Sequence, residues 1–374
     1  MRTLKQIREI TLEHMKNETV ELGEKVTSIA LADYRDSTLF QRELEVIRKR
    51  PLPFVASDKI KKTGDVFAGE LAGVPIVAVR NEQDIRVFIN TCRHRGALLA
   101  SEGTKKDCQK LVCPFHGWSY SLEGELLEVP SSHQCFSKHT TSAFRLQELK
   151  SYEKAGMIWV VLSPHSQENI FEESFHQLHK DSDEIGLNPQ HAMPEMSFLA
   201  PFNWKVGVEA FLEVYHFAHA HAPYLSQLQF PNLSLADSYN ENCRIVVPLK
   251  QPAGEIPVLG WAQVMYFIFP SSFLLFYDDH VALISLVPQT TGETKFRYTP
   301  IVPREADLKN EKIQQRVEFL KIILGQDIAI LEGVQKGLDA NRNGKFVFTR
   351  LEQILEKFHQ DLHSNASAKS HPTS

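Results

Sequence analysis

Two short segments of the chain each place one cysteine close to one histidine. Cys92 and His94 are separated by one residue, and Cys113 and His116 by two. Thiolate and imidazole ligands suit either a tetrahedral zinc ion or a [2Fe–2S] cluster with both cysteines on one iron and both histidines on the other. Zinc modules usually take their cysteines from one loop and their histidines from another, whereas here each segment supplies one of each. The spacing therefore favours the iron–sulfur cluster.

The residues around each pair support this interpretation. Gly96 and Gly117 allow the backbone to approach a cluster and to donate N–H groups to its sulfur atoms. The motif, Cys-x-His followed by Cys-x-x-His, is of the Rieske type. Respiratory Rieske proteins carry an extra cysteine in each loop, but none stands here, and Cys108 is interpreted as an ordinary loop residue. A low-potential, ferredoxin-like cluster is therefore predicted.

A second group of candidate ligands lies in an apolar segment that is predicted to form one helix over 204–220, closed by Pro223. On such a helix Glu209, Glu213 and His216 share one face. The surrounding side chains are apolar nearly all round, which predicts a buried helix. Because a buried charge needs a partner or a metal, these polar side chains are candidate ligands or partners of ligands.

Spacing alone leaves the second imidazole ligand open. His221 follows His216 by five residues, about 140° around an ideal helix, so the helix must loosen or end for both to bind one ion. His219, three residues after His216, is the competitor. Two histidines and one carboxylate form the ligand set of non-haem Fe(II) oxygenases. Asp327, on the apolar stripe of a late helix, is the predicted carboxylate, and Glu332 is the fallback.

Periodicity and turn signals predict an α+β chain. Short strands over 52–164 predict an all-β [2Fe–2S] domain, and 165–362 is predicted to be a mononuclear iron domain with one antiparallel sheet. Residues 1–51 are expected to form a helical segment that packs on this second domain, and 363–374 a disordered tail. The predicted helices cover 3–17, 38–50, 204–220, 304–338 and 347–362, and 165–200 is predicted to be a linker plus a short helix. The predicted strands cover 76–80, 85–90, 118–121, 125–129, 157–162, 244–249, 262–269, 273–277, 281–287 and 294–301.

Composition sets the class of protein and excludes several functions. The chain has 374 residues, of which 43% are hydrophobic and 23% charged, as expected of a globular protein. The net charge of −5 offers no basic surface for nucleic acid, and no apolar run is long enough to span a membrane. Five cysteines are too few for a disulfide scaffold, and charges interrupt the N-terminus where a secretory signal would be apolar. A cytoplasmic protein is predicted.

The two groups of ligands, in this order, resemble the catalytic (alpha) component of Rieske non-haem iron oxygenases, the ring-hydroxylating oxygenase family. The resemblance covers about residues 38–362. It implies one [2Fe–2S] cluster and one mononuclear Fe(II) per chain, and a helix-grip catalytic domain in which a curved antiparallel sheet surrounds a long helix. Electrons from NAD(P)H are expected to arrive through a separate reductase or ferredoxin, since the chain has no Gly-x-Gly-x-x-Gly fingerprint.

The resemblance also implies which residues bind the mononuclear iron. The family's two histidine ligands stand five residues apart, which implies His216 and His221 rather than His219. Its third ligand is an Asp in the late helix, and Asp327 stands at the matching position.

A carboxylate that bridges two metal centres is a further expectation from the family. Its members form head-to-tail trimers, in which electrons pass from the cluster of one subunit to the iron of its neighbour. By position, Glu213 would join His216 to His116 of the partner subunit. The bridging residue is usually Asp, and the branch that oxidises quaternary amines such as carnitine resembles this chain in having Glu. This departure bears on the substrate and not on the oxygenase activity.

The main interpretation is a terminal oxygenase that activates O₂ at Fe(II) and hydroxylates or oxidatively demethylates a small organic molecule, with aromatic ring hydroxylation as the main reaction. An alternative is monooxygenation of a quaternary or methylated amine of the carnitine or betaine kind. A different class, a Rieske electron-transfer protein, would need only the first domain and would leave His216 and His221 without a metal.

Overall fold

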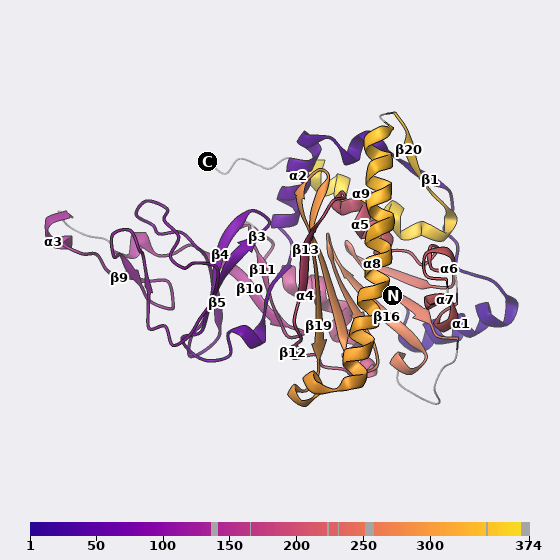
Figure 1. Ribbon diagram of the computed structural model, residues 1–374, viewed down its shortest axis with the longest axis horizontal. Helices are drawn as coiled ribbons and strands as arrows, with labels where there is room; N and C mark the ends of the chain where they lie inside the picture. Colours follow the sequence, from indigo (N-terminus) through magenta and orange to yellow (C-terminus); the bar gives the residue numbers. More distant parts are fainter. Residues whose placement is uncertain are drawn as a thin grey trace. The chain divides into compact units, whose positions relative to one another are not determined.

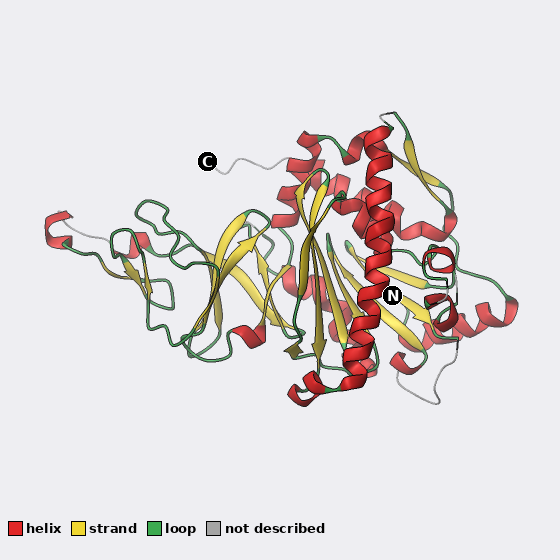
Figure 2. Ribbon diagram, viewed as in Figure 1, coloured by secondary structure: helices red, strands yellow, loops and turns green. Residues whose placement is uncertain are grey.

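The computed structural model describes residues 1–135, 141–164, 166–222, 224–230, 232–250, 258–341 and 343–367. The chain divides into two compact units, one formed by Arg48–Glu168 and the other by Met1–Ile47 together with Asn169–Ser374. Figure 2 shows that the first unit consists mainly of strands and loops, whereas the second combines a sheet with most of the helices. None of the described helices has the length and apolar character that crossing a bilayer requires.

The smaller unit is built from antiparallel strands, as the sequence predicts. Its strands are β2 (Leu52–Ala56), β3 (Val66–Leu71), β4 (Val74–Arg80), β5 (Ile85–Ile89), β6 (Gly103–Lys105), β7 (Leu111–Val112), β8 (Ser119–Tyr120), β9 (Leu126–Glu128), β10 (Glu148–Lys154) and β11 (Met157–Val161). Seven of them form one sheet in the order β2–β11–β10–β5–β4–β3–β6, and β7, β8 and β9 form another. Short helical turns are η2 (Ser57–Lys59), α3 (Ser132–Cys135) and η3 (Thr141–Phe144).

The turn between β4 and β5 explains why these two strands could be predicted from the sequence. The side-chain oxygen of Asn81 accepts hydrogen bonds from the backbone N–H groups of Gln83 and Asp84, at 2.9 and 2.8 Å. Such a side chain replaces a backbone partner in a tight turn. The predicted strands on either side of this turn are therefore confirmed, to within two residues at each end.

The larger unit contains one antiparallel sheet in the order β12–β19–β18–β17–β16–β15–β14, with β13 also pairing with β19. The strands are β12 (His191–Ala192), β13 (Met196–Ala200), β14 (Leu235–Tyr239), β15 (Asn242–Pro248), β16 (Ala262–Ile268), β17 (Ser272–Phe276), β18 (Val281–Thr290) and β19 (Glu293–Val302). A separate pair joins β1 (Thr27–Ala30) to β20 (Lys345–Phe348). The central strands are buried along almost their whole length, so they are continuously apolar instead of alternating. The predicted single sheet is confirmed.

A long helix lies against this sheet, as the helix-grip expectation requires (Figure 1). This helix, α8 (Glu311–Ala340), begins where the side chain of Asn310 accepts the N–H groups of its first turn. Its buried positions recur every three or four residues, and Asp327 is the charged one among them.

The other helices are α1 (Leu4–Asn17), α2 (Ser37–Arg48), α4 (Ile170–Ile185), α5 (Trp204–Phe211), α6 (Phe217–Ala220), α7 (Leu225–Leu228) and α9 (Gln353–Ser367). Single 3₁₀ turns are η1 (Leu31–Tyr34), η4 (Val258–Gly260), η5 (Glu305–Lys309) and η6 (Arg350–Glu352).

The predicted helix over 204–220 is wrong, because the chain leaves helical geometry after Phe211. The N–H of Leu212 bonds to the carbonyl of Glu209, three residues back, which tightens and closes α5. Glu213 and His216 therefore meet across a turn between α5 and α6 and not along one helical face. Pro223, predicted to close the helix, lies outside the described residues.

Three further predicted boundaries also differ from the structure. The late helix starts at Glu311 and not at 304, since the 3₁₀ turn η5 precedes it. The last helix starts at Gln353 because residues before it pair as β20 with the distant β1, and partners far along the chain override local periodicity. It continues to Ser367, so 363–367 are helical, and the rest of the predicted tail is outside the described residues. Within 165–200 the helix α4 is 16 residues long, and β12 and β13 follow it.

A buried arginine on β15 forms ion pairs with α4 and with β14 in the larger unit. Arg244 on β15 is fully buried and donates to Asp181 of α4 at 2.6 Å and to Asp237 of β14 at 2.7 Å. It also donates to the backbone oxygen of Arg2, and the hydroxyl of Tyr266 donates to Asp181 at 2.7 Å. Arg244 is therefore the cation that pairs with buried Asp181, whereas Asp237 also pairs with Arg2 at 2.6 Å.

Replacing Arg244 by Met should destabilise the larger unit by about 3–5 kcal/mol, because buried Asp181 loses its cation and Asp237 keeps only Arg2. Urea unfolding followed by far-ultraviolet circular dichroism measures this loss. The control Lys321→Met breaks the exposed pair with Glu318 and should cost at most about 1 kcal/mol. Equal losses in the two variants would contradict the role given to Arg244.

Candidate active site

The segment that carries both candidate histidines is fixed where α5 begins. Asn203 caps this helix: its side-chain oxygen accepts the N–H of Lys205 at 2.9 Å, and its amide nitrogen donates to the carbonyl of Tyr34 at 2.7 Å. Lys205 is itself buried, and its ammonium group lies 2.5 Å from a carboxylate oxygen of Glu43 on α2. Because the start and the length of α5 are fixed, the residues that follow it are also placed at a fixed position, close to α8.

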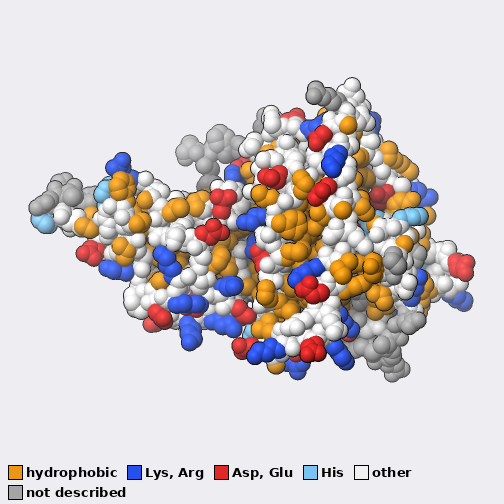
Figure 3. Space-filling model, in the orientation of Figure 1, with side chains coloured by type: hydrophobic (Ala, Val, Ile, Leu, Met, Phe, Trp, Pro, Cys, Tyr) orange, Lys and Arg blue, Asp and Glu red, His pale blue; other side chains and the backbone are white. Residues whose placement is uncertain are grey.

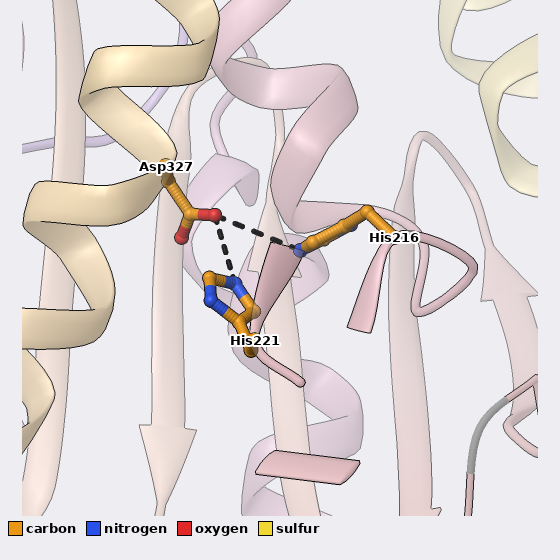
Figure 4. A group of neighbouring side chains, drawn as sticks. All are labelled: His216, His221 and Asp327. Carbon is orange, nitrogen blue, oxygen red and sulfur yellow. Dashed lines mark ion pairs between the residues drawn. The ribbon is translucent and has the colours of Figure 1, made fainter. Parts of the chain in front are cut away.

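His216, His221 and Asp327 point toward one another (Figure 4). Their ligand atoms, one from each residue, all lie within 4.8 Å of each other. Nε2 of His221 is 2.9 Å from Oδ1 of Asp327, and Nε2 of His216 is 3.8 Å from the same oxygen. Within the described part of the chain, this is the one group of three or more such side chains that could hold a metal ion. The structure therefore brings together the three residues that the sequence singled out.

The arrangement has the character of ligands around a cation. His221 is fully buried, and its Nε2 has no hydrogen-bond partner of suitable geometry although Asp327 lies close to it. The carboxylate of Asp327 is 8% exposed at the residue level and needs a positive partner of its own. Two imidazoles and one carboxylate leave coordination positions open, and this set suits ferrous iron. The residues present therefore fit a mononuclear iron.

The second nitrogen of each imidazole is held by a neighbouring side chain. Nδ1 of His216 bonds to Oε1 of Glu213, whose other oxygen accepts the backbone N–H of His216 at 3.1 Å. Nδ1 of His221 lies 2.9 Å from Oε1 of Gln326, the residue before Asp327. Such partners fix the orientation and tautomer of each ring and leave Nε2 free to bind a metal.

Two competing candidates stand outside this group. His219 is exposed on α6, and Glu332 lies more than one turn beyond Asp327 on α8. Neither residue lines the cavity at the three ligands or belongs to the group that could hold an ion. The geometry favours His221 and Asp327 over them.

The three residues line a cavity of about 700 Å³ in the larger unit. One wall is formed by α8, and the opposite wall by strands β15, β16 and β17. The side chains nearest in sequence to the histidines are apolar, and so are most of those on α8 and the strands, including Phe211, Val214, Met265, Leu275, Leu320 and Ile323. A volume of this order suits an organic molecule of more than one ring.

In the smaller unit the two loops that each carry one cysteine and one histidine lie face to face. Each loop closes through backbone hydrogen bonds at its cysteine. Gly96 and Gly117 occupy equivalent places in the two loops, with φ of +75° and +73°, where a side chain would be strained. The ring centroids of His94 and His116 are 4.7 Å apart. The structure therefore brings the two halves of the motif together.

The ligand atoms of these loops do not converge on a single ion among the described residues. Cys92 and Cys113 are buried, 4% and 3% exposed, whereas His94 and His116 are exposed. One zinc ion would need all four side chains around one point. A [2Fe–2S] cluster distributes them over two irons, with the cysteines on the inner one and the histidines on the outer one. The loops fit the cluster better.

The comparisons with known proteins identify the domains that contain the two groups of candidate ligands. Residues 176–367 match the family described as ring hydroxylating alpha subunit (catalytic domain), which is more than half of the chain. The chain belongs to this family. Residues 50–153 match the Rieske [2Fe–2S] domain.

Relatives of this oxygenase differ in their substrates. The choline monooxygenase of Amaranthus tricolor is 26% identical over 353 residues, covering 88% of this chain and 76% of that protein. The alpha subunit of biphenyl 2,3-dioxygenase from Rhodococcus jostii is 31% identical over 193 residues, 49% of this chain and 41% of that subunit. Among solved structures, a quaternary ammonium Rieske monooxygenase superposes with a TM-score of 0.77 at 19% identity, covering 91% of this chain and 96% of that one. Naphthalene 1,2-dioxygenase gives 0.75 at 18% identity, with 93% and 94% covered.

These findings establish the class of reaction and the cofactors. The protein is the catalytic subunit of a Rieske oxygenase, which carries a Rieske cluster and a mononuclear iron and receives its electrons from a reductase. The choice between an aromatic and a quaternary-amine substrate stays open at this level, because relatives of both kinds match.

Two residues that contact candidate ligands were missed in the sequence analysis. Gln326 was not given a role, since a glutamine beside a ligand carries no signal by itself. Tyr120 was missed for the same reason: its hydroxyl lies 3.3 Å from Sγ of Cys92 and accepts the N–H of Arg93 at 3.1 Å. Burial raises the pKa of Tyr120 well above its ordinary value, so the hydroxyl keeps its proton and can donate it to the sulfur.

Replacing Tyr120 by Phe should lower the reduction potential of the Rieske cluster, on the order of tens of millivolts, because a hydrogen bond to a cysteine sulfur stabilises the reduced state. Redox titration followed by visible circular dichroism measures the potential. Tyr152→Phe, elsewhere in the smaller unit, is the matched control and should leave it unchanged. A potential that does not move in Tyr120→Phe would mean that the hydroxyl does not donate to the sulfur.

Proposed function

We propose that this oxygenase hydroxylates or oxidatively demethylates a largely apolar substrate that contains an aromatic ring. Its mononuclear iron is held by His216, His221 and Asp327, and its Rieske cluster by the two cysteines and two histidines of the facing loops. The observation that carries the substrate class is the apolar cavity of about 700 Å³ that begins at the three iron ligands.

The charges of this cavity do not favour a substrate that carries a carboxylate. Arg316 is the one lysine or arginine in the described lining, and its guanidinium already donates to Asp278 and, at 2.7 Å, to Asp279. A carnitine-like carboxylate would therefore find no unpaired cation there. No tryptophan is part of the described lining, although tryptophan is the best face for a quaternary ammonium group. Phenylalanine and aliphatic side chains pack well against a ring.

A methylated or quaternary amine is the second candidate, and two observations favour it. Glu213 stands where most of the family has Asp, as in the carnitine-oxidising branch. The matched relatives also include choline monooxygenases aligned over most of this chain and the carnitine monooxygenase oxygenase subunit of Escherichia coli, 27% identical over about half of each chain. We give the size and the mainly apolar walls of the cavity more weight than Glu213 or the relatives, because the walls contact the substrate directly.

The chain's own residues have separate tasks in this reaction. When bound, the iron supplies the activation of dioxygen. Glu213 and Gln326 orient the two imidazoles through Nδ1, and the apolar walls position the substrate and exclude water. Glu213 also offers carboxylate oxygens as acceptors for His116 of the partner subunit, which would give a short hydrogen-bonded route between the two metal centres.

A head-to-tail homotrimer is part of the proposal, since a bridge by Glu213 needs a second subunit. Figure 3 shows hydrophobic side chains gathered on the face of the larger unit that carries α8, and Ile322 and Ile330 of this helix are 53% and 48% exposed. In the smaller unit Phe115, beside His116, is 55% exposed. Exposed apolar side chains of this size are typical of contact surfaces.

The cytoplasmic location and the division into domains at 51, 164 and 362 stay predictions.

Replacing His216, His221 or Asp327 by Ala should abolish turnover and remove the mononuclear iron, while the Rieske absorption and electron paramagnetic resonance spectra persist, because the two sites lie in separate units. Iron analysis and those spectra measure the two outcomes. The matched control His219→Ala should retain the iron and most of the activity. Loss of the iron in His219→Ala but not in His221→Ala would overturn the assignment.

Replacing Glu213 by Gln keeps the size of the side chain but removes its charge and one acceptor. We expect both metal centres to remain and the oxidation of the reduced cluster to slow by roughly 10- to 100-fold or more. Single-turnover stopped flow with substrate and O₂ follows this step. Glu213→Asp should keep partial activity, since only reach is lost. Cluster oxidation at the parental rate in Glu213→Gln would contradict the bridge, and loss of the iron would make Glu213 a ligand.

The substrate class is tested with the purified oxygenase and a surrogate reductase. Naphthalene and biphenyl represent ring substrates, and choline and carnitine represent trimethylated amines. The proposal predicts O₂ consumption coupled to an oxygenated product of a ring compound, identified by mass after reaction under ¹⁸O₂. Product from the amines alone would establish the second candidate instead.

A further inference from the structure

The cavity has a polar end that the oxygenase reaction does not account for. Gln229, Gln263, Tyr277 and His280 all line it, and hydrogen bonds and ring stacking join them to one another. We propose that these four side chains form a second subsite, which binds a hydroxyl group of the substrate while its ring lies toward the iron. This inference rests on the proposed oxidation of a ring-containing substrate and adds the polar group that such a substrate carries.

The position of this subsite follows from α8. Arg316 and Asp327 both line the cavity, and Asp327 follows Arg316 by eleven positions on α8, which corresponds to about 16 Å along the helix. The guanidinium of Arg316 bonds to Asp279, which is the neighbour of His280 in the chain. His280 therefore belongs to the end of the cavity near Arg316, and an elongated molecule could reach it from the iron.

His280 is held rigidly and lacks one partner. Its side chain is 1% exposed, its Nδ1 lies 2.7 Å from a carboxylate oxygen of Asp279, and its ring stacks on Tyr277 with centroids 4.8 Å apart. A carboxylate only accepts, so Nδ1 carries the proton and Nε2 is the atom left for another partner. Nε2 is buried and has no hydrogen-bond partner in the described protein.

Gln229 shows the same deficiency. Its residue is 5% exposed, its Nε2 donates to Oε1 of Gln263 at 2.9 Å, and Gln263 in turn hydrogen-bonds the side chain of Tyr277. Oε1 of Gln229 is buried without a partner in the described residues. Buried polar atoms of folded proteins are nearly always satisfied, by protein, water or ligand. Two unsatisfied atoms on the lining of one cavity point to a ligand group that pairs with them.

A hydroxyl is the group that fits these atoms best. It can donate its one proton to Nε2 of a neutral His280 or to Oε1 of Gln229, and with a protonated His280 it accepts from Nε2 and donates to Oε1, which pairs both atoms. A carboxylate is disfavoured, because Asp278 and Asp279 together outweigh the single charge of Arg316. A quaternary ammonium group has no N–H to donate. The four side chains are therefore specificity-determining for a hydroxylated substrate.

The test is equilibrium dialysis of the oxidised holoenzyme, without reductase, against 4-phenylphenol and 4-methylbiphenyl, two ring compounds of almost equal size. The parent enzyme should bind the phenol at least about tenfold more tightly, in line with hydrogen bonds to buried partners. Gln229→Leu and His280→Phe should each lose most of this preference while binding 4-methylbiphenyl as before. Gln360→Leu, exposed on α9, is the matched control and should keep the preference.

The outcomes separate this subsite from the proposed function. Equal affinity of the parent for both compounds would overturn the subsite and leave ring binding intact. Failure of both compounds to bind would overturn the ring substrate as well. Preference for the phenol that survives in both variants, or equally tight binding of biphenyl-4-carboxylate, would overturn the assignment of these residues to a hydroxyl. Thermal unfolding verifies that each variant is folded. If His280→Phe does not fold, the binding preference of Gln229→Leu alone tests the subsite.

Discussion

A carboxylate buried against two imidazoles is the constraint on which the larger unit depends. Asp327 is the charged residue among the buried positions of α8, and Nε2 of both histidines lies within 4 Å of its oxygen. Such an arrangement is costly unless a cation joins it. Much of the larger unit can be understood as keeping these three side chains in place: the capped start of α5, the break after Phe211, and the long helix packed over the sheet.

The break between α5 and α6 also explains what the sequence could and could not predict. The candidate ligands Cys92, His94, Cys113 and His116 were identified because residue type and spacing carry chemistry. Spacing left the choice between His219 and His221 open, and the resemblance to the family decided it. The helix through them was predicted wrongly because polar and apolar residues keep helical periodicity as far as Ala220. The spacing of apolar residues cannot predict the turn in which the side chain of Glu213 accepts the backbone N–H of His216. The same turn is what allows His216 and His221 to face one point.

Residues that act through another residue were the ones missed. Gln326 and Tyr120 each contact a candidate ligand, and Gln229 and His280 line one cavity only when β16, β17 and the chain after α7 come together. No local pattern distinguishes them from ordinary polar residues. The strands β13 and β14 were missed for a related reason, since their existence depends on pairing with β19 and β15. The apolar runs at the centre of the sheet were predicted well because burial on both faces leaves a continuous signal.

The central claim is that two iron centres occupy the two groups of ligands. Anomalous diffraction from crystals of the purified protein, collected on both sides of the iron and zinc absorption edges, tests it most directly. The account predicts iron peaks at two places: a single one between His216, His221 and Asp327, and a pair of irons between the facing loops of the smaller unit. A zinc peak between those loops, or an iron ligated by His219 in place of His221, would contradict it.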